Sequence, residues 1–296
     1  MQSLTRMRQA LIIRDLLPAF VLGVLVCGVG IRTRAAAQPE TQARDSAARR
    51  DRHVFQVGEE LEYRVSYSFF RIGTIRFRVT DRVEREGRVA YHTETFIDSN
   101  PALSWLTDVH IRFYGETDEE VFSYWWIGDD STNRQVEYRQ IRFDYPNHRM
   151  FYEWGKKLTT GERRWSGIDT VQVSGQGQDG LSLFFYAREN VRQRSKQIVP
   201  TFIENKEAKA TVNFLNERRD MEIDAVDYPV DVVYFDGRAD FVGVFGLTGG
   251  FEGWFSNDEA RIPIAARLKV ILGSIKVELT KWKRGAWTPP KYPPKG

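Results

Sequence analysis

The sequence predicts a mainly β protein: a strongly curved antiparallel sheet, with the form of a half-barrel or open roll, and one short packed helix. Hydrophobic side chains recur at every second position over most of the chain after Val54, which is the period of a strand with one buried face. Only residues 179–192 place large apolar side chains at helical spacing. Aromatic residues make up 13% of the chain, more than one sheet face needs for its core.

The first clear element is an antiparallel hairpin over residues 59–83. Leu61, Tyr63 and Val65 alternate with polar side chains, Gly73 interrupts the pattern, and the alternation then resumes. Further strands are expected at 88–99, 109–113, 119–127, 135–145, 150–154, 198–202, 207–215, 221–226 and 231–235, with late hairpins at 252–272 and 274–282.

Two segments carry helix signals. Asn100 before Pro101 predicts a short helix, because Asn is a good N-cap and Pro fits the first helical position. Residues 179–192 form the principal predicted helix, with Asp179 as its cap. Its apolar face is expected to pack against the sheet.

We expect four segments along the chain: a signal peptide (1–37), a flexible leader (38–53), a single β-rich domain (54–284) and an extended, loosely attached Pro-rich tail (285–296). Arginines precede an uncharged stretch at 16–31, and Ala37 ends a run of three alanines that fits signal cleavage. Lipid attachment at Cys27 is disfavoured because Val26 is not small, while retention as an N-terminal anchor stays open. The expected location is the periplasm or outer envelope.

Charge gives no support for a nucleic-acid partner. The full chain has 43 basic and 40 acidic residues, a net charge of +3. Residues 1–37 hold five arginines and one aspartate, so removal of this segment leaves 38 basic and 39 acidic residues, a net charge of −1. The basic excess therefore belongs to the export signal, and we expect no nucleic-acid binding.

Catalytic and metal motifs are weak. The four histidines, at 53, 92, 110 and 148, share no metal-ligand spacing. The run from Gly175 to Gly180 matches a dinucleotide-binding glycine pattern, but its surroundings are antiparallel strands instead of a βαβ unit. Asp98 and Asp108 form an acid/base pair only in principle, since capping and solvation explain them. We expect no metal, no cofactor and no catalytic residue, and leave the enzyme question open with a non-enzyme favoured.

The late segment 251–263 is the most distinctive of the chain. Its residues predict a strand, a tight turn and a second strand that begins with a fixed proline. Asp258 is expected to accept hydrogen bonds from the turn backbone and to pair with Arg261. We interpret the segment as a structural hairpin built on Trp254, Ser256, Asp258, Arg261 and Pro263.

Three segments in this order carry a family resemblance: FQVGEELEYRVSY at 55–67 followed by Gly73, DGLSLFFYAR at 179–188, and WFSNDEARIP at 254–263. Together they resemble the bacterial exported family known as domain of unknown function 3108, over roughly residues 54–282. Gly180 stands where the family pattern has a proline. The resemblance implies an envelope location and a β-rich fold, and it implies no activity or site residues.

The favoured function is the non-enzymatic binding of a hydrophobic or amphipathic envelope molecule in the concave face of the sheet. Neighbouring aromatic residues put apolar surface on both faces of single strands, which indicates a second buried environment. The candidate ligand-binding residues are Trp105, Trp125, Trp126, Phe184 and Phe185. The expected partners are a lipid or other apolar small molecule, or an envelope protein, with no transmembrane span in the mature chain. The alternatives are an assembly or scaffold protein and a hydrolase of envelope polymers.

Overall fold

The computed structural model describes residues 54–85, 87–105, 108–132, 135–158, 160–242, 247–270 and 273–294. All of them lie in the compact unit Ala47–Gly296. The predictions for the signal peptide, the leader and Cys27 fall outside the described residues.

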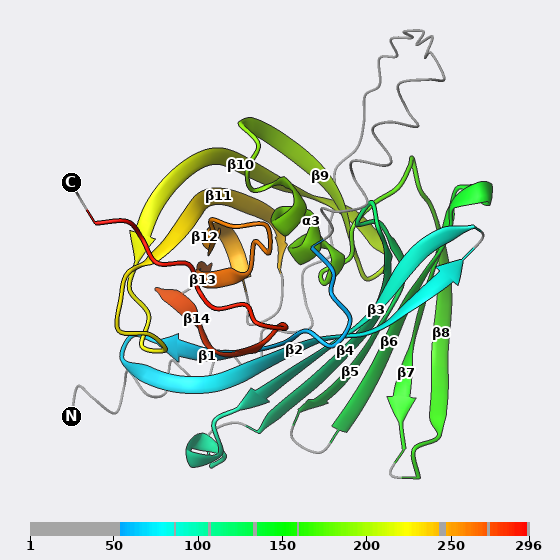
Figure 1. Ribbon diagram of the computed structural model, residues 1–296. Coiled ribbons are helices and arrows are strands. Elements are labelled where there is room, and N and C mark those ends of the chain that lie inside the picture. Colours follow the sequence, from blue (N-terminus) through cyan, green and yellow to red (C-terminus); the bar gives the residue numbers. More distant parts are fainter. Residues whose placement is uncertain are drawn as a thin grey trace, which may run out of the picture. The chain divides into compact units, whose positions relative to one another are not determined.

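Within the described residues, strands form a single 14-stranded antiparallel sheet in the order β8-β7-β6-β5-β4-β3-β2-β1-β14-β13-β12-β11-β10-β9 (Figure 1). The strands are β1 (Glu60–Tyr67), β2 (Phe70–Arg85), β3 (Arg88–Ser99), β4 (Val109–Asp118), β5 (Ser123–Thr132), β6 (Gln135–Asp144), β7 (Arg149–Lys157), β8 (Arg163–Gln172), β9 (Ser195–Ile203), β10 (Lys206–Met221), β11 (Val230–Val242), β12 (Leu247–Ser256), β13 (Pro263–Val270) and β14 (Ser274–Lys283). Two 3-10 turns, η2 (Pro101–Leu103) and η3 (Tyr145–Asn147), and the helix α3 (Ser182–Asn190) connect them.

The order of strands follows from two series of hairpins. Strands that are consecutive in sequence pair from β1 through to β8, and again from β9 through to β14. The first and last strands, β1 and β14, pair in the middle of the sheet, with Val65 opposite Val277. The two edges are therefore β8 and β9, which α3 connects, and the sheet is open and curved as the sequence predicts.

Helix α3 lies inside the curve of the sheet (Figure 1). Phe185 is fully buried, and its ring centroid lies 4.2 Å from that of Phe55 and 5.2 Å from that of Phe77 on β2. Asp179 Oδ1 accepts hydrogen bonds from the backbone N–H groups of Leu181 and Ser182, at 2.6 and 2.8 Å. These bonds hold the turn that starts the helix, so the regular helix begins after Asp179.

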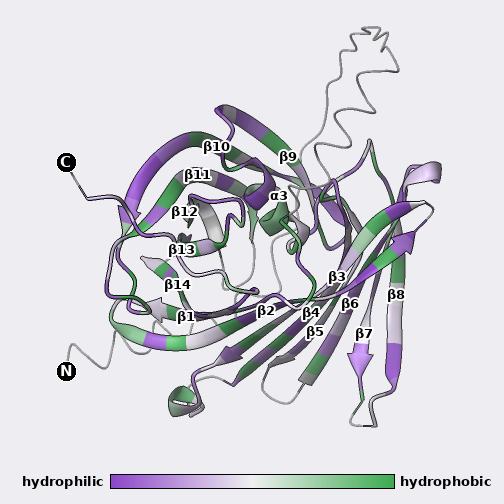
Figure 2. Cartoon of the chain, viewed as in Figure 1, coloured by the Kyte–Doolittle hydropathy of each residue, from purple (hydrophilic) through white to green (hydrophobic). Residues whose placement is uncertain are grey.

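Hydrophobic and hydrophilic residues alternate along most strands (Figure 2). Cross-strand partners share a face of the sheet, so the contact of Phe77 with α3 identifies the face that the helix covers. The partner of Phe77 is Thr95, and across β4 and β5 the same row continues through Phe113 and Gly128. We call the side of the sheet that carries this row the helix-facing surface.

Most expected strands are present, and four expectations need correction. Residues 274–282 were expected to form a hairpin, but they belong to the single strand β14. Residues 119–122 form a turn before β5, because Asp118 Oδ1 accepts the N–H groups of Glu120 and Phe122. Residues 222–229 are outside any strand, since β10 already ends at Met221. Strand β8 was not predicted: as an edge strand it is largely exposed on both sides and so has a weak hydrophobic alternation.

The C-terminal segment is attached to the domain instead of loose. The N–H of Asp231 donates to the carbonyl oxygen of Pro290 at 2.7 Å, and the N–H of Tyr292 donates to that of Pro229 at 2.8 Å. The expectation of loose attachment overlooked these backbone bonds to β11 and the preceding loop. Among the described residues, no helix has the length and apolar character needed to cross a membrane.

Candidate functional site

The helix-facing surface extends along β2 to β5 beyond the part that α3 contacts. Leu181, at the start of the helix, lies over Gly115 on β4. Farther along the strands, Phe113 and Ile111 follow on β4, and Ile75 lies on the same face of β2; all three are partly exposed. The helix therefore leaves part of this apolar surface open to solvent.

Trp126 occupies the centre of this surface. Its ring lies over Gly128, where a Cβ atom would come within 2.6 Å of the indole, and its centroid is 5.1 Å from that of Phe113. The glycine is needed because any side chain there would displace the indole. The indole N–H of Trp126 and the hydroxyl of Thr95 are buried and have no hydrogen-bond partner among the described residues. The surface thus combines apolar side chains with two unsatisfied polar groups.

Strand β9 and the turn after it lie against the same face of β6 to β8. The ring of Phe202 contacts that of Phe143 edge to face, at a centroid distance of 5.2 Å. The side-chain amide of Asn205 donates to Asp169 on β8 at 2.7 Å. These contacts bound the open surface on the β6–β8 side.

The structure does not bring the five predicted aromatic residues together. Trp126 lies on the helix-facing surface. Phe184 and Phe185 are residues of α3; Phe185 is fully buried and Phe184 is partly buried. Trp125 immediately precedes Trp126 on β5 and therefore lies on the opposite face, near His92 at a centroid distance of 5.7 Å. Trp105 lies in the loop after η2 and is 74% exposed.

The opposite face carries two separate polar clusters, each with one histidine and its carboxylate partners. His110 Nδ1 lies 2.7 Å from Asp98 and its Nε2 lies 3.1 Å from Asp108. His92 Nε2 lies 2.9 Å from Glu116, six positions from His110 along β4 and so about 20 Å away. The candidate carboxylates 98 and 108 thus meet at His110 and not at one centre with His92. Among the described residues, no group of three or more His, Cys, Asp or Glu side chains is arranged so that it could hold a metal ion.

Two open hollows lie outside the helix-facing surface. The first, of about 420 Å³, is lined by residues of β4, β5, β6 and β7 that include His110, Arg112, Asp129 and Lys157. The second, of about 440 Å³, lies on β9, β10 and β11. None of the five predicted aromatic residues lines either hollow.

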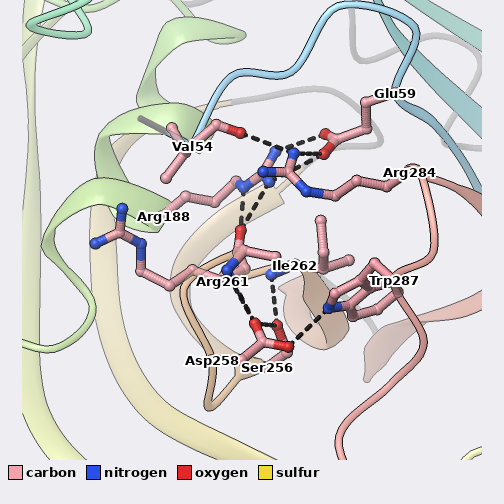
Figure 3. A network of polar contacts seen from close by, with 10 residues as sticks. Val54, Glu59, Arg188, Ser256, Asp258, Arg261, Ile262, Arg284 and Trp287 are labelled. Atoms are coloured by element: carbon pink, nitrogen blue, oxygen red, sulfur yellow. Dashed lines mark hydrogen bonds and ion pairs between the residues drawn. The ribbon is translucent and has the colours of Figure 1, made fainter. Parts of the chain in front are cut away.

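A buried ionic network joins the helix, the chain before β1 and the chain after β14 (Figure 3). Arg188 on α3 and Glu59 are both fully buried, and the guanidinium donates to the two carboxylate oxygens at 2.8 and 3.3 Å. Arg188 also donates to the backbone carbonyls of Ala260 and Arg261, at 3.0 and 3.2 Å. Arg284 forms a second ion pair with Glu59, and burial lowers the pKa of its guanidinium.

The late turn between β12 and β13 is the other half of this network (Figure 3). Asp258 Oδ1 accepts hydrogen bonds from the Ser256 hydroxyl and from the N–H groups of Ala260 and Arg261, at 2.8 to 3.1 Å. Its Oδ2 accepts the indole N–H of Trp287 at 2.7 Å. Ser256 Oγ in turn accepts the N–H of Ile262 at 2.7 Å. One carboxylate therefore satisfies the turn backbone and fixes the C-terminal segment.

The remaining residues of the predicted hairpin surround this turn. Arg261 adopts a left-handed backbone with φ of 46°, and its guanidinium donates to Glu189 at 3.1 Å. Trp254 is buried against Tyr234, and Pro263 opens β13. Sequence reasoning missed Glu59 and Arg284, because the residues that meet there lie 225 positions apart. The one sequence feature that pointed to this ionic network was its third member, Arg188, which follows the apolar residues of α3 at helical spacing.

Comparisons with known proteins show a family and a fold. The chain is similar in structure to a β-barrel-like protein of domain of unknown function DUF1849 from Brucella abortus, with a TM-score of 0.51, 8% identity, and coverage of 76% of this chain and 97% of that one. A protein from Bacteroides fragilis, named as a candidate exported protein with a YmcC-like fold, gives a TM-score of 0.28 and 7% identity, over 77% of this chain and 97% of that one. No curated protein sequence matches.

The first of these likenesses, at 8% identity, shows a shared fold alone. A family model described as protein of unknown function (DUF3108) matches residues 62–280, which is most of the chain. The resemblance carried by the three sequence segments is thereby confirmed, and the chain belongs to the DUF3108 family.

Proposed function

We propose that this is an exported cell-envelope protein that binds an amphipathic molecule with an acyl or similar apolar chain on the helix-facing surface. The observation that carries the proposal is the pairing of unsatisfied polar groups with open apolar area. Ile75, Ile111 and Phe113 supply partly exposed apolar contacts, and the indole N–H of Trp126 and hydroxyl of Thr95 have no partner among the described residues.

The energetics favour a ligand at this place. A buried donor without an acceptor costs about 1 to 3 kcal/mol, so the protein gains when the Trp126 ring shifts on binding and its N–H meets an acceptor of the ligand. Ligand sites typically combine apolar lining with a few orienting polar groups. Each methylene of a chain buried there contributes about 0.8 kcal/mol, so several suffice for micromolar binding.

Export is supported by the sequence. The basic N-terminal region, the uncharged stretch at 16–31 and the alanines before Gln38 fit a cleaved signal. Expressed with its own leader in a Gram-negative host, the protein should be recovered from the periplasm with Gln38 at its N-terminus. Recovery of a form that starts at Met1, or that carries lipid on Cys27, would contradict this.

The binding test starts from protein purified from the envelope of its host. Native mass spectrometry and solvent extraction should reveal a co-purifying lipid-like molecule, and the stripped protein should take up an apolar fluorescent probe. Ile111→Gln should weaken probe uptake because it makes the open surface polar. The matched control is Ile168→Gln on β8, where the side chain is 57% exposed and points away from the helix-facing surface.

Trp126→Phe separates a binding role from a structural one. It removes the unsatisfied N–H and keeps an aromatic ring, so the ligand-free protein should keep or increase its stability. Ligand affinity should fall by up to about tenfold, the value of one hydrogen bond. If no molecule co-purifies, no probe is taken up and Trp126→Phe changes neither property, the binding proposal is wrong.

A further inference from the structure

Two neighbouring loops present exposed aromatic side chains at one end of the sheet. Phe69 is 83% exposed and Phe70 is 56% exposed at the turn between β1 and β2, and their ring centroids are 4.2 Å apart. Ser68 has a left-handed backbone with φ of 55°, which makes the turn tight and leaves both rings at its tip. Trp105, in the loop between β3 and β4, is 74% exposed.

The two loops are joined at their bases. The N–H of Asn100 donates to the carbonyl oxygen of Ile72, and its side-chain amide donates to that of Arg71, both at 2.9 Å. Asn100 also caps η2, from which the loop continues to Trp105. The aromatic side chains are therefore held on one rim of the domain. This rim is distant from α3, since Phe70 lies seven residues from Phe77 along β2, or about 20 Å.

A cation accompanies these rings. Arg71 follows Phe70 and is exposed, and its guanidinium donates to the hydroxyl of Thr74 at 3.0 Å. Among the described residues it forms no ion pair. An exposed guanidinium beside aromatic rings is complementary to the boundary between anionic headgroups and acyl chains, where aromatic side chains and basic residues both concentrate.

We propose that Phe69, Phe70, Trp105 and Arg71 form a lipid-binding rim that docks the protein on an anionic membrane surface. The size of the patch favours a bilayer over a protein partner. Three aromatic side chains bury at most about 150 to 250 Å² each, or together about 450 to 750 Å², which is less than the roughly 800 Å² per partner of a stable protein interface. Insertion of loop tips into a bilayer needs no such area. The inference is independent of ligand binding on the helix-facing surface.

Vesicle flotation tests the proposal. Protein purified after expression of the full chain should float with vesicles of phosphatidylglycerol and phosphatidylcholine, and more weakly with phosphatidylcholine alone. The combined variant Phe69→Ser, Phe70→Ser and Trp105→Ser should lower the partition coefficient by about 100-fold or more, because burial of each ring contributes roughly a factor of ten. Arg71→Gln should weaken binding to the anionic vesicles alone, by about fivefold.

The control variant carries Trp165→Ser and Ile168→Ser on β8, two residues that are also about half exposed. It should float like the wild type, and all variants share one N-terminus, so a contribution from that segment cancels. Thermal melts check folding, and Phe69→Ser alone provides a minimal variant at the most exposed ring. The proposal is overturned if the wild type does not float, or if the combined variant floats equally well. It is also overturned if size-exclusion chromatography shows that the rings instead join two copies of the chain.

Discussion

Glu59 forms ion pairs with two buried arginines, and its replacement is the sharpest test of how this fold is held together. Glu59→Gln preserves the shape of the side chain, so any loss of stability arises from charge and hydrogen bonding. The substitution turns one acceptor oxygen into an NH₂ group that faces guanidinium donors. It also leaves Arg188 and Arg284 buried, with side chains 0% and 10% exposed and no anion between them.

The magnitude follows from the contacts. Two hydrogen bonds from Arg188 to Glu59, at 2.8 and 3.3 Å, involve charged groups, and such bonds contribute about 1.5 to 3 kcal/mol each. A second estimate comes from buried ion pairs in general, where removal of one partner costs about 3 to 5 kcal/mol. Both routes give several kcal/mol, a large part of the roughly 5 to 15 kcal/mol that stabilises a typical domain.

Urea denaturation measures the effect. With a slope of about 1 to 3 kcal/mol per molar, the midpoint should fall by about 1 M or more. The matched control is the adjacent Glu60→Gln, because Glu60 is 44% exposed and lies 3.4 Å from Lys283 and 3.6 Å from Arg78. Exposed ion pairs of this kind contribute about 0 to 1 kcal/mol. Equal midpoints for the two variants would refute the reasoning.

The sequence predicted the β fold well because each strand with one buried face leaves a local record. Strand β3 was expected at 88–99 and has those bounds, and the hairpin at 59–83 matches β1 and β2. The turn at 119–122 was missed because its second half is apolar: Val121 is buried although its φ is 63°, and Phe122 follows it. A hydrophobic side chain in a turn cannot be distinguished from a strand residue by periodicity alone.

The candidate sites were harder to predict because they depend on contacts between distant segments. Trp125 and Trp126 are adjacent in sequence, so alternation places them on opposite faces without telling which face the helix covers. The packing of Phe185 against Phe77 on β2 determines which face of the sheet the helix covers. Similarly, Asp258 has a local role that the sequence suggests, while its bond to Trp287 depends on how the C-terminal segment returns.

Four further predictions concern packing at two glycines, the late turn and pH. Gly128→Val should displace the Trp126 ring and cost about 1 to 3 kcal/mol in thermal or chemical unfolding. Gly180→Ala should be nearly neutral, since no atom lies within 4 Å of the added carbon. Asp258→Ala should cost about 2 to 4 kcal/mol, because it leaves several buried donors unpaired; a melt equal to that of the parent would refute this.

Burial raises the pKa of Asp118 from 3.8 to about 6, although Phe122 and Arg88 oppose the rise. The folded state therefore binds the proton more tightly than the unfolded state, so this carboxyl favours folding below pH 4 and loses that contribution as the pH rises through 6. The two values differ by about two pH units, or about 3 kcal/mol. Asp118→Asn should remove this pH dependence from denaturation curves recorded between pH 4 and 7, and an NMR titration that places the Asp118 carboxyl near 4 would show that the reasoning is wrong.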